Sequence, residues 1–524
     1  MLDYIVVGAG SSGCALVGSL IAAGKSVSLV EAGGGDFSPF IKIPAGQPKA
    51  IINNSFQYKA NADLSRNGDS EVWSTGRVLG GGSSINGTMF VRGSRSDFDC
   101  WATQGNEGWA FSDLLPIFKE MESADQMNKF RGNTGPLFVR TVSRPHKLTK
   151  AFVSSAAQAG IPFNKDYNGQ YQHGVAFAQL SQEKGFRCSS ASAFLKPHLK
   201  SPKLTRHLNS TVERLLIKDG QVTGVVVRKG KKTHTLVAKR VVLCAGALNT
   251  PKILMLSGVG DVNKLREVGV EPIVESAQVG KNLQEHPLVR LTYETSIPSN
   301  NLSEGIFQKI GIAYEYVRNK QGPISNIFEA VAFIKTKSDL KNPDVQIHFI
   351  TVGLRKPKEV SDSMLLKFPS ITVYVNVSHP KCKGEVYLRS KDPIADPVID
   401  FRLLDSEEDV DTLVRAIEIV RKIVQGNCIK PYIKQEVSPG VNVNNPEKLR
   451  SYVRNNTEIS YHPVGTCRMG PDSDSVVSSD LKVRGLDNLW IADASIMPNL
   501  ISGNTNATCI LIGLKAAEIL ISTE

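Results

Sequence analysis

The 524-residue sequence predicts an α/β protein of two domains, one with a mostly parallel sheet and one with an antiparallel sheet and helices. Three observations lead to this expectation. A strand, glycine loop, helix and second strand open the chain at residues 4–31, and short buried apolar runs return at 240–244 and 489–493. Between about 290 and 450 the pattern changes to spaced strands followed by a helix. Because the buried runs stand at both ends of the chain, the first domain should be discontinuous.

The predicted domain boundaries follow these changes of pattern. The first domain is assigned residues 1–150, 200–290 and 455–524, and the second domain residues 151–199 and 291–454. A length of 524 residues is about two to four times that of a common single domain, which agrees with this division.

The first thirty residues have the pattern of a dinucleotide-binding βαβ unit. Gly8 permits the tight turn, Gly10 lets the backbone approach a pyrophosphate, and Gly13 lets the helix pack on the strand. The helix N-terminus attracts phosphate, and Glu31 after the second strand can accept hydrogen bonds from a ribose. The unit predicts a Rossmann-like domain and leaves NAD and FAD both open.

A second glycine loop covers residues 76–87, with three consecutive glycines before two serines. Its exposed N–H groups and small side chains suit a flat ring system or a diphosphate. The alternative is a plain flexible loop, which the ordered placement of Arg77 and Asn86 disfavours. Residues 245–247 form a third segment whose backbone can come close to a ligand.

The remaining elements are predicted from local patterns. Asp219-Gly220 and Lys229-Gly230 mark turns between short strands, and Pro251 is placed in the first turn of a helix. The expected elements are strands at 203–209, 210–217, 222–228, 240–244, 345–351, 370–378, 385–389 and 489–493, and helices at 250–256 and 409–424.

Composition limits the class of protein. Eight scattered cysteines without a C-x-x-C pair predict reduced thiols and no metal site. The formal charge of +12 is dispersed, with one dense cluster at 228–232 in a predicted hairpin, so we expect no nucleic-acid partner. The absence of a signal-peptide pattern and of any run of about 20 apolar residues predicts a cytoplasmic protein. Peripheral contact with the inner face of a membrane stays an alternative.

Five motifs in order resemble the glucose-methanol-choline (GMC) oxidoreductases over essentially the whole chain. They are the two glycine loops, residues 246–260, residues 280–286 and the C-terminal pair 461–470 and 493–507. The resemblance implies FAD as the cofactor. Within the family, the motifs and their spacing are most similar to the bacterial branch of choline, sorbose and related alcohol dehydrogenases, and residues 92–101 and 187–191 resemble the sorbose dehydrogenase type. The FAD contacts implied by these motifs are Gly8, Gly10, Ser11, Ser12, Gly13, Glu31, Ala32, Arg77, Leu79, Gly80, Gly82, Ser83, Asn86, Gly87, Thr88, Met89, Val212, Ala245, Gly246, Asp493, Ala494, Asn504 and Thr505.

The same resemblance implies a catalytic pair. In the family the histidine of the His-Pro-x-Gly-Thr segment faces the flavin, which here is His462, and its partner 44 residues on is Asn506 (506 minus 462). Alcohol oxidation removes a hydroxyl proton and a hydride from one carbon, so a base must reach the oxygen while the carbon faces the flavin. His462 suits the proton, and Asn506 can donate a hydrogen bond to the alkoxide.

Other residues are placed by the same reasoning. Some relatives attach FAD through a histidine where this chain has Ile85, so FAD is expected to be noncovalent. His286 is expected to be a satisfied structural histidine, whereas Glu329 and His348 are candidates for lining the substrate pocket or for packing.

The predicted function is FAD-dependent oxidation of a sugar, polyol, choline-like, aromatic or aliphatic alcohol, with electrons passed to oxygen or a quinone. Two alternatives stay open: a lyase of the hydroxynitrile type, in which the same histidine cleaves a cyanohydrin, and a flavin-binding protein without catalysis. A monomer and a homodimer are both allowed, with the dimer favoured by its frequency among proteins.

Overall fold

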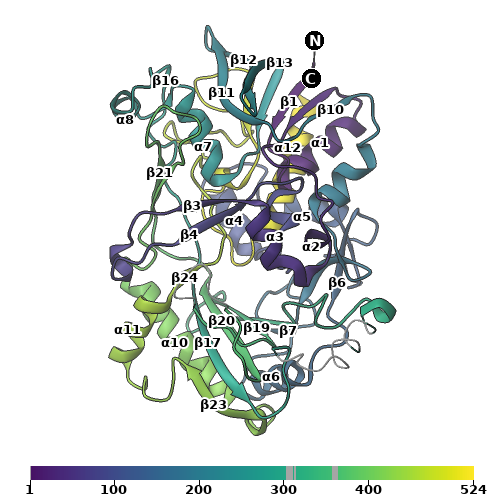
Figure 1. Cartoon of the computed structure of the whole chain (residues 1–524), viewed down its shortest axis with the longest axis vertical. Coiled ribbons are helices and arrows are strands. Elements are labelled where there is room, and N and C mark those ends of the chain that lie inside the picture. Colours follow the sequence, from purple (N-terminus) through teal and green to yellow (C-terminus); the bar gives the residue numbers. More distant parts are fainter. Residues whose placement is uncertain (1, 302–310, 312–313, 315, 357–363, 524) are drawn as a thin grey trace.

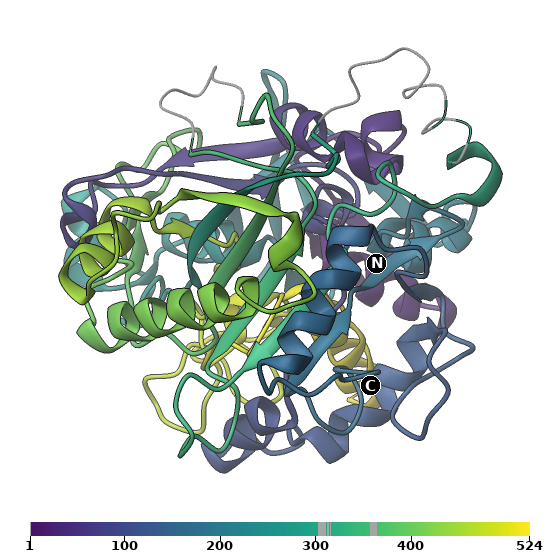
Figure 2. The same cartoon turned by 90° about the horizontal axis from the view of Figure 1, so that it is seen from below.

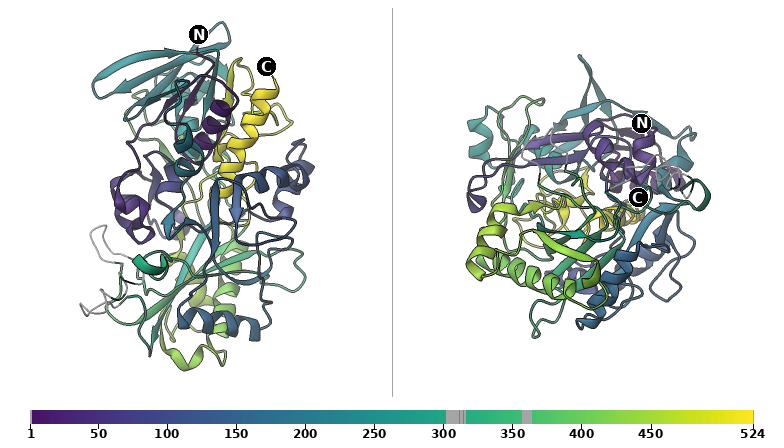
Figure 3. Two further views of the ribbon diagram at one scale, coloured as in Figure 1. Left: turned by 90° about the vertical axis from the view of Figure 1, so that its right-hand side faces the viewer. Right: turned by 60° about the horizontal axis from the view of Figure 1, so that its bottom comes forward.

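The computed structural model describes residues 2–301, 311, 314, 316–356 and 364–523. The molecule is elongated, with both termini at one end and a large antiparallel sheet at the other (Figure 1). The side view shows the same division and places the C-terminal helix beside the first helix (Figure 3). The predicted α/β class with one parallel and one antiparallel sheet is confirmed.

The parallel sheet has five strands in the order β10-β2-β1-β14-β25. Both ends of the chain therefore contribute to one sheet, as the recurring buried runs predicted. Its strands are β1 Tyr4–Val7, β2 Val27–Val30, β10 Leu204–His207, β14 Arg240–Leu243 and β25 Leu489–Ile491.

Helices α1 (Ser11–Ala22) and α12 (Asn506–Ser522) pack closely on each other. A Cβ on Gly513 would lie 2.2 Å from the carbonyl oxygen of Ser12, so a glycine is needed at this approach. The contact joins the start of the chain to its end.

An antiparallel sheet of β11 (Thr211–Lys218), β12 (Gln221–Lys229) and β13 (Lys232–Val237) adjoins the parallel sheet. Asp219 and Gly220 both have positive φ, 50° and 76°, as a two-residue hairpin turn requires. The predicted hairpins are confirmed.

Helix α7 (Gly246–Leu256) begins four residues before the predicted start at 250, so placing Pro251 in the first turn was wrong. Pro251 lies inside the helix, where its missing N–H leaves the carbonyl of Ala247 without its helical donor. The Thr466 hydroxyl donates to that oxygen at 2.5 Å. A proline is tolerated here because a residue of the His-Pro-Val-Gly-Thr segment replaces the lost hydrogen bond.

The large antiparallel sheet has the order β23-β17-β20-β19-β18-β7, with β24 paired to β17. Its strands are β7 Gly174–Phe177, β17 Pro287–Thr295, β18 Ala330–Ile334, β19 Val345–Ile350, β20 Ser370–Val377, β23 Ile433–Ser438 and β24 Glu458–Ile459. The predicted strand at 385–389 is outside this sheet, because β21 (Glu385–Tyr387) pairs with β22 (Val398–Asp400) instead.

One face of the large sheet is apolar and is covered by α6 (Lys147–Gln158), α10 (Glu407–Val424) and α11 (Pro446–Asn456). Figure 2 shows α10 lying across the strands. The buried residues of this core include Ile347 and Phe349, and Phe349 stacks on Phe152 of α6 with ring centroids 4.5 Å apart. Since side chains alternate along a strand, Gln346 and His348 point to the opposite face.

Smaller elements connect these sheets. They are α2 Pro39–Lys42, α3 Gln47–Asn53, α4 Arg95–Thr103, α5 Phe111–Met121, α8 Val262–Glu267, β3 Ser55–Lys59, β4 Val72–Gly76, β5 Glu122–Ala124, β6 Leu137–Thr141, β8 Gln179–Glu183, β9 Phe186–Arg187, β15 Val259–Gly260 and β16 Val274–Glu275. Among the described residues, no helix is both long and apolar enough to cross a membrane.

Candidate active site

The first glycine loop joins β1 to α1. Gly8 has a φ of +101°, and a Cβ there would lie 2.4 Å from the carbonyl oxygen of Cys244. The Glu31 carboxylate accepts hydrogen bonds from the backbone N–H groups of Ala9 at 2.9 Å and Gly33 at 2.8 Å, while burial raises the pKa of Glu31 to about 7. Glu31, whose carboxylate was expected to bind a ribose, therefore also holds the backbone of the first glycine loop in place.

The second glycine loop packs directly on the first. The N–H of Gly80 donates to the carbonyl of Ala9 at 2.7 Å, and a Cβ on Gly81 would lie 2.7 Å from the Cα of Gly10. A Cβ on Gly82 would meet no described atom within 4 Å. The two loops touch along one side and leave space beside Gly82.

Arg187 of β9 holds the end of this second loop. Its Nη1 donates to Asn86 Oδ1 at 2.6 Å and to the carbonyl of Ser83 at 3.2 Å, and its Nε donates to the carbonyl of Ile41. These partners are all uncharged, and Nη2 has no partner among the described residues. Burial lowers the pKa of Arg187 to about 9. A buried cation that pairs with no carboxylate in the described part of the chain therefore adjoins the loop.

Asp493, at the end of the last parallel strand, fixes the third loop. One carboxylate oxygen accepts from the N–H of Gly246 at 2.8 Å and from the Thr250 hydroxyl at 2.6 Å, and the other accepts from the N–H of Ser495 at 2.8 Å. A Cβ on Gly246 would meet no described atom within 4 Å. The remaining expected cofactor contacts lie on or next to these loops, except Val212 on β11 and Thr505 directly before α12. Those on or next to the loops are Ser12, Gly13, Ala32, Arg77, Leu79, Gly87, Thr88, Met89, Ala245 and Ala494.

His462 lies against a second histidine. Its Nδ1 is 3.0 Å from Nδ1 of His286, and Nε2 of His286 is 3.0 Å from the carbonyl oxygens of both Ser378 and Ile501. Burial lowers the pKa of His286 to about 3, and burial together with His286 and His348 lowers the pKa of His462 well below its usual value. Both rings are therefore neutral at neutral pH.

The two candidate asparagines occupy different places. Asn504, 42 residues after His462, has its Nδ2 at 3.1 Å from His462 Nε2, and its Oδ1 accepts from Gln346 Nε2 at 3.1 Å. The amide of Asn506, expected as the partner of His462, donates instead to the Ser11 hydroxyl at 2.8 Å, on the first glycine loop.

Glu285 completes a cluster with the two histidines. Glu285, His286 and His462 bring potential ligand atoms within 4.8 Å of one another. The Glu285 carboxylate accepts from the N–H groups of both histidines, at 2.8 Å for His286 and 2.7 Å for His462, and burial raises the pKa of Glu285 well above its usual value. The two rings bind each other through Nδ1, and the carboxylate binds backbone N–H groups. The expectation of no metal stays a prediction.

His348 and Glu329, the two residues predicted to line the substrate pocket or to pack, have different surroundings. His348 lies on the polar face of β19, and its Nε2 is 3.0 Å from Asn376 Oδ1 of β20. Glu329 instead accepts hydrogen bonds from the N–H of His146 and the hydroxyl of Thr149, at the beginning of α6. Of the two, His348 is the one that contributes to the lowered pKa of His462.

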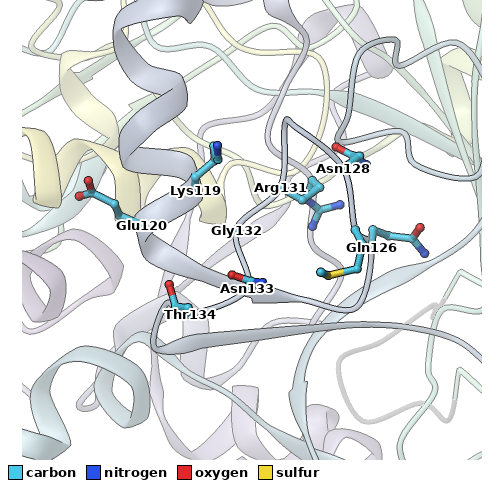
Figure 4. Close-up of a pocket in the computed structure, with 9 residues that line it drawn as sticks. Lys119, Glu120, Gln126, Asn128, Arg131, Gly132, Asn133 and Thr134 are labelled. Atoms are coloured by element: carbon cyan, nitrogen blue, oxygen red, sulfur yellow. The ribbon is translucent and has the colours of Figure 1, made fainter.

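A cavity of about 360 Å³ lies at the end of α5, apart from the segments above (Figure 4). Arg131 in its wall is paired with Glu122 and Asp166 at 2.6 Å each. Its lining contains none of the expected site residues: Lys119, Glu120, Gln126, Met127, Asn128, Arg131, Gly132, Asn133 and Thr134.

Family models and known proteins were compared with the chain. The N-terminal and C-terminal models described as GMC oxidoreductase match residues 2–288 and 380–513. The chain belongs to the GMC oxidoreductase family. It is 36% identical to an alcohol dehydrogenase (acceptor) of Pseudomonas putida, over 99% of this chain and 96% of that protein. It is also 36% identical to an oxygen-dependent choline dehydrogenase of Rhizobium etli, over 100% of this chain and 96% of the relative.

Solved structures agree with this assignment. Pyridoxine 4-oxidase from Mesorbium loti superimposes with a TM-score of 0.90 at 27% identity, covering 99% of both chains. Formate oxidase of Aspergillus oryzae RIB40 gives a TM-score of 0.91 at 23% identity, covering 100% of this chain and 98% of its own, and this shows the shared fold. The GMC oxidoreductase is thus an FAD-dependent enzyme acting on CH–OH donors.

The loops of this GMC oxidoreductase fit FAD. The first loop ends at the beginning of α1, and the second and third loops leave open space at Gly82 and Gly246. A side chain at either glycine would enter that space. Helix N-termini and glycine backbone suit a pyrophosphate. Arg187, which the sequence analysis did not assign to the cofactor, adds a buried positive charge beside the second loop that an anionic cofactor would neutralise.

Proposed function

We propose that this GMC oxidoreductase oxidises an alcohol with His462 as the base, and that Asn504 is its hydrogen-bonding partner. The observation that carries the proposal is the chain of contacts through His286, His462 and Asn504. It determines where the protons sit on both rings.

The assignment begins at His286 Nε2. Carbonyl oxygens only accept, so the nitrogen that lies 3.0 Å from two of them carries a hydrogen. The neutral His286 ring then has a bare Nδ1, which accepts from Nδ1–H of His462. His462 Nε2 is left with a free lone pair, directed at the Asn504 amide. An alcohol hydroxyl at this place would give its proton to His462 Nε2.

The two amides receive separate roles. Asn504 Nδ2 can donate to the alcohol oxygen while negative charge develops on it, and Gln346 keeps the amide oriented by donating to its Oδ1. Asn506 holds the first glycine loop through Ser11. The base-and-amide pair expected from the sequence is proposed with Asn504 in place of Asn506.

FAD, when bound, supplies the hydride acceptor. Ile85 is 6% exposed and packs with Ile41 and Val78, without a nucleophilic atom, so we propose noncovalent FAD. Precipitation of the purified protein with acid should release the yellow chromophore into the supernatant. Retention of the colour in the washed pellet would contradict noncovalent binding.

The central experiment is anaerobic mixing of the FAD-loaded protein with alcohols in a stopped-flow spectrometer. An alcohol should bleach the flavin absorbance, and His462→Ala should slow the bleaching by about 10² to 10⁴ while FAD content is retained. Separate mixing of the reduced protein with oxygen and with a quinone identifies the electron acceptor. Cyanide release from a cyanohydrin with the flavin still oxidised would instead establish the lyase, and unchanged bleaching in His462→Ala would exclude His462 as the base.

A further inference from the structure

Three side chains near His462 present polar atoms without partners. Gln346 Oε1, His348 Nδ1 and Asn376 Nδ2 are buried and have no hydrogen-bond partner among the described residues. The side chains are 0%, 5% and 0% exposed respectively. Leaving a buried polar group unpaired is costly, so three such groups in one place indicate a ligand that pairs with them.

The three side chains lie on one polar face of the large sheet. Gln346 and Asn376 are directly paired across β19 and β20, and His348 follows Gln346 on the same face of β19. Such positions are about 5 Å apart across strands and about 7 Å apart along a strand. Gln346 contacts Asn504, which contacts His462, so the face continues to the proposed base.

The donor and acceptor pattern is fixed by the hydrogen bonds already made. His348 is neutral, because burial lowers its pKa to about 4, and its Nε2–H donates to Asn376 Oδ1. The free atoms are then two acceptors, Gln346 Oε1 and His348 Nδ1, and one donor group, the Asn376 amide N–H₂. A ligand must donate twice and accept at least once. Neighbouring hydroxyl groups do both.

The charges of the surroundings favour an uncharged ligand. Asp97 is paired with His379 at 2.7 Å, and Arg290 is paired with Glu458. Glu285 accepts backbone N–H groups from the other side of His462. A buried ammonium or carboxylate on the ligand would need a counter-charge, and the polar face supplies only neutral groups.

We propose that the substrate is an uncharged polyhydroxylated molecule, a sugar or polyol, whose additional hydroxyl groups bind Gln346, His348 and Asn376 while the reacting hydroxyl faces His462. This assignment rests on the proposed alcohol oxidation. It excludes choline-like cations and simple monohydroxy alcohols as the preferred class.

The first test measures the anaerobic flavin-reduction rate per substrate concentration with D-sorbitol, D-glucose, 1-hexanol, benzyl alcohol, choline and pyridoxine. A polyol or sugar should exceed the monohydroxy alcohols and choline by at least about a hundredfold, because a site built for several hydroxyls discriminates against their absence. Fastest reduction by choline, pyridoxine or a monohydroxy alcohol would overturn the substrate class and leave alcohol oxidation intact. Reduction by none would instead contradict the proposed function.

The second test uses apolar replacements of similar shape, His348→Phe and Asn376→Leu, with Thr412→Val on α10 as a matched buried polar control. Each of the two replacements should lower the second-order rate for the best polyol by about 5- to 100-fold and that for 1-hexanol by less than about threefold. Equal losses for both substrates would show that the three atoms have a structural role only. The control should change neither rate, and retained FAD content verifies folding of each variant.

Discussion

His379 Nε2 lies 2.7 Å from Asp97 Oδ1, and this pair joins the two segments whose carbonyl groups hold His286. His379 follows Ser378, while Asp97 also accepts from the N–H and hydroxyl of Ser502, which follows Ile501. The carbonyl groups of Ser378 and Ile501 both accept from Nε2–H of His286. The ion pair of His379 and Asp97 holds these two carbonyl groups in place, and it therefore supports the tautomer that His286 imposes on His462.

The pair predicts a defined pH dependence of stability. The pKa of His379 is raised by Asp97 against its burial, and the pKa of Asp97 is lowered by His379 against its own burial. The His379 contribution is present below about pH 6.5, its unfolded pKa, and is lost as pH rises through the higher folded pKa. The Asp97 contribution is present above about pH 3.9 and is lost as pH falls through the lower folded pKa. Thermal unfolding of wild type and His379→Gln should therefore differ most between about pH 4 and 6.5, and least at alkaline pH. A difference that grows above neutrality would contradict the ion pair.

Alanine replacements should separate the two asparagines. Asn504→Ala should lower the flavin-reduction rate by about 10- to 1000-fold with FAD affinity retained, because it removes the donor beside His462 Nε2. Asn506→Ala should weaken FAD binding with a smaller effect on the reduction rate of the loaded enzyme, because it frees Ser11. FAD titration of the apoprotein and single-turnover reduction measure the two effects. The reverse pattern would restore Asn506 as the partner of the base.

Arg187→Gln should weaken FAD binding and lower the reduction potential of bound FAD. Glutamine retains donors toward Asn86 and Ser83 but removes the buried positive charge that favours an anionic cofactor and its more negative reduced form. Apoprotein titration and redox potentiometry measure both effects. Arg484→Gln, at a partly buried arginine that donates to Gly470 and Ser475, is the control. An unchanged potential and affinity in Arg187→Gln would show that its charge does not reach the cofactor.

The hydrogen bond that replaces the missing donor of Pro251 can be measured by a double-mutant cycle. Thr466→Val should lower the free energy of unfolding by about 1–3 kcal/mol, because it leaves the buried Ala247 carbonyl unpaired. In the Pro251→Ala background the new N–H can reach this oxygen, so Thr466→Val should cost clearly less. Chemical denaturation of the four proteins tests this. Equal costs in both backgrounds would show that the two residues are not coupled.

Much of the fold was predictable because parallel strands buried on both faces leave compact apolar runs, as at Val241 to Leu243, and Asp219-Gly220 determines its own turn. The beginning of α7 was not, since the carboxylate that receives the N–H of Gly246 comes from Asp493, 247 residues away. The sequence could not decide between Asn504 and Asn506 as the partner of His462, because the two asparagines stand two residues apart and only tertiary contacts distinguish them. Gln346 and Asn376 carry no local signal, because their role arises from strand pairing.

The contact between Ser11 and Asn506 joins residues that are 495 positions apart in the chain. In the parallel sheet, β1 likewise lies between β2, which is made soon after it, and β14, which is made much later. At 5–20 residues per second, roughly 25 to 100 s of synthesis separate the two ends of this contact. Throughout that time the opening βαβ unit lacks β25 and α12, and until residues 240–243 are made it also lacks β14, so part of its apolar surface is exposed. The opening βαβ unit is therefore made first and completed last, and we expect FAD to bind after synthesis of the chain is finished.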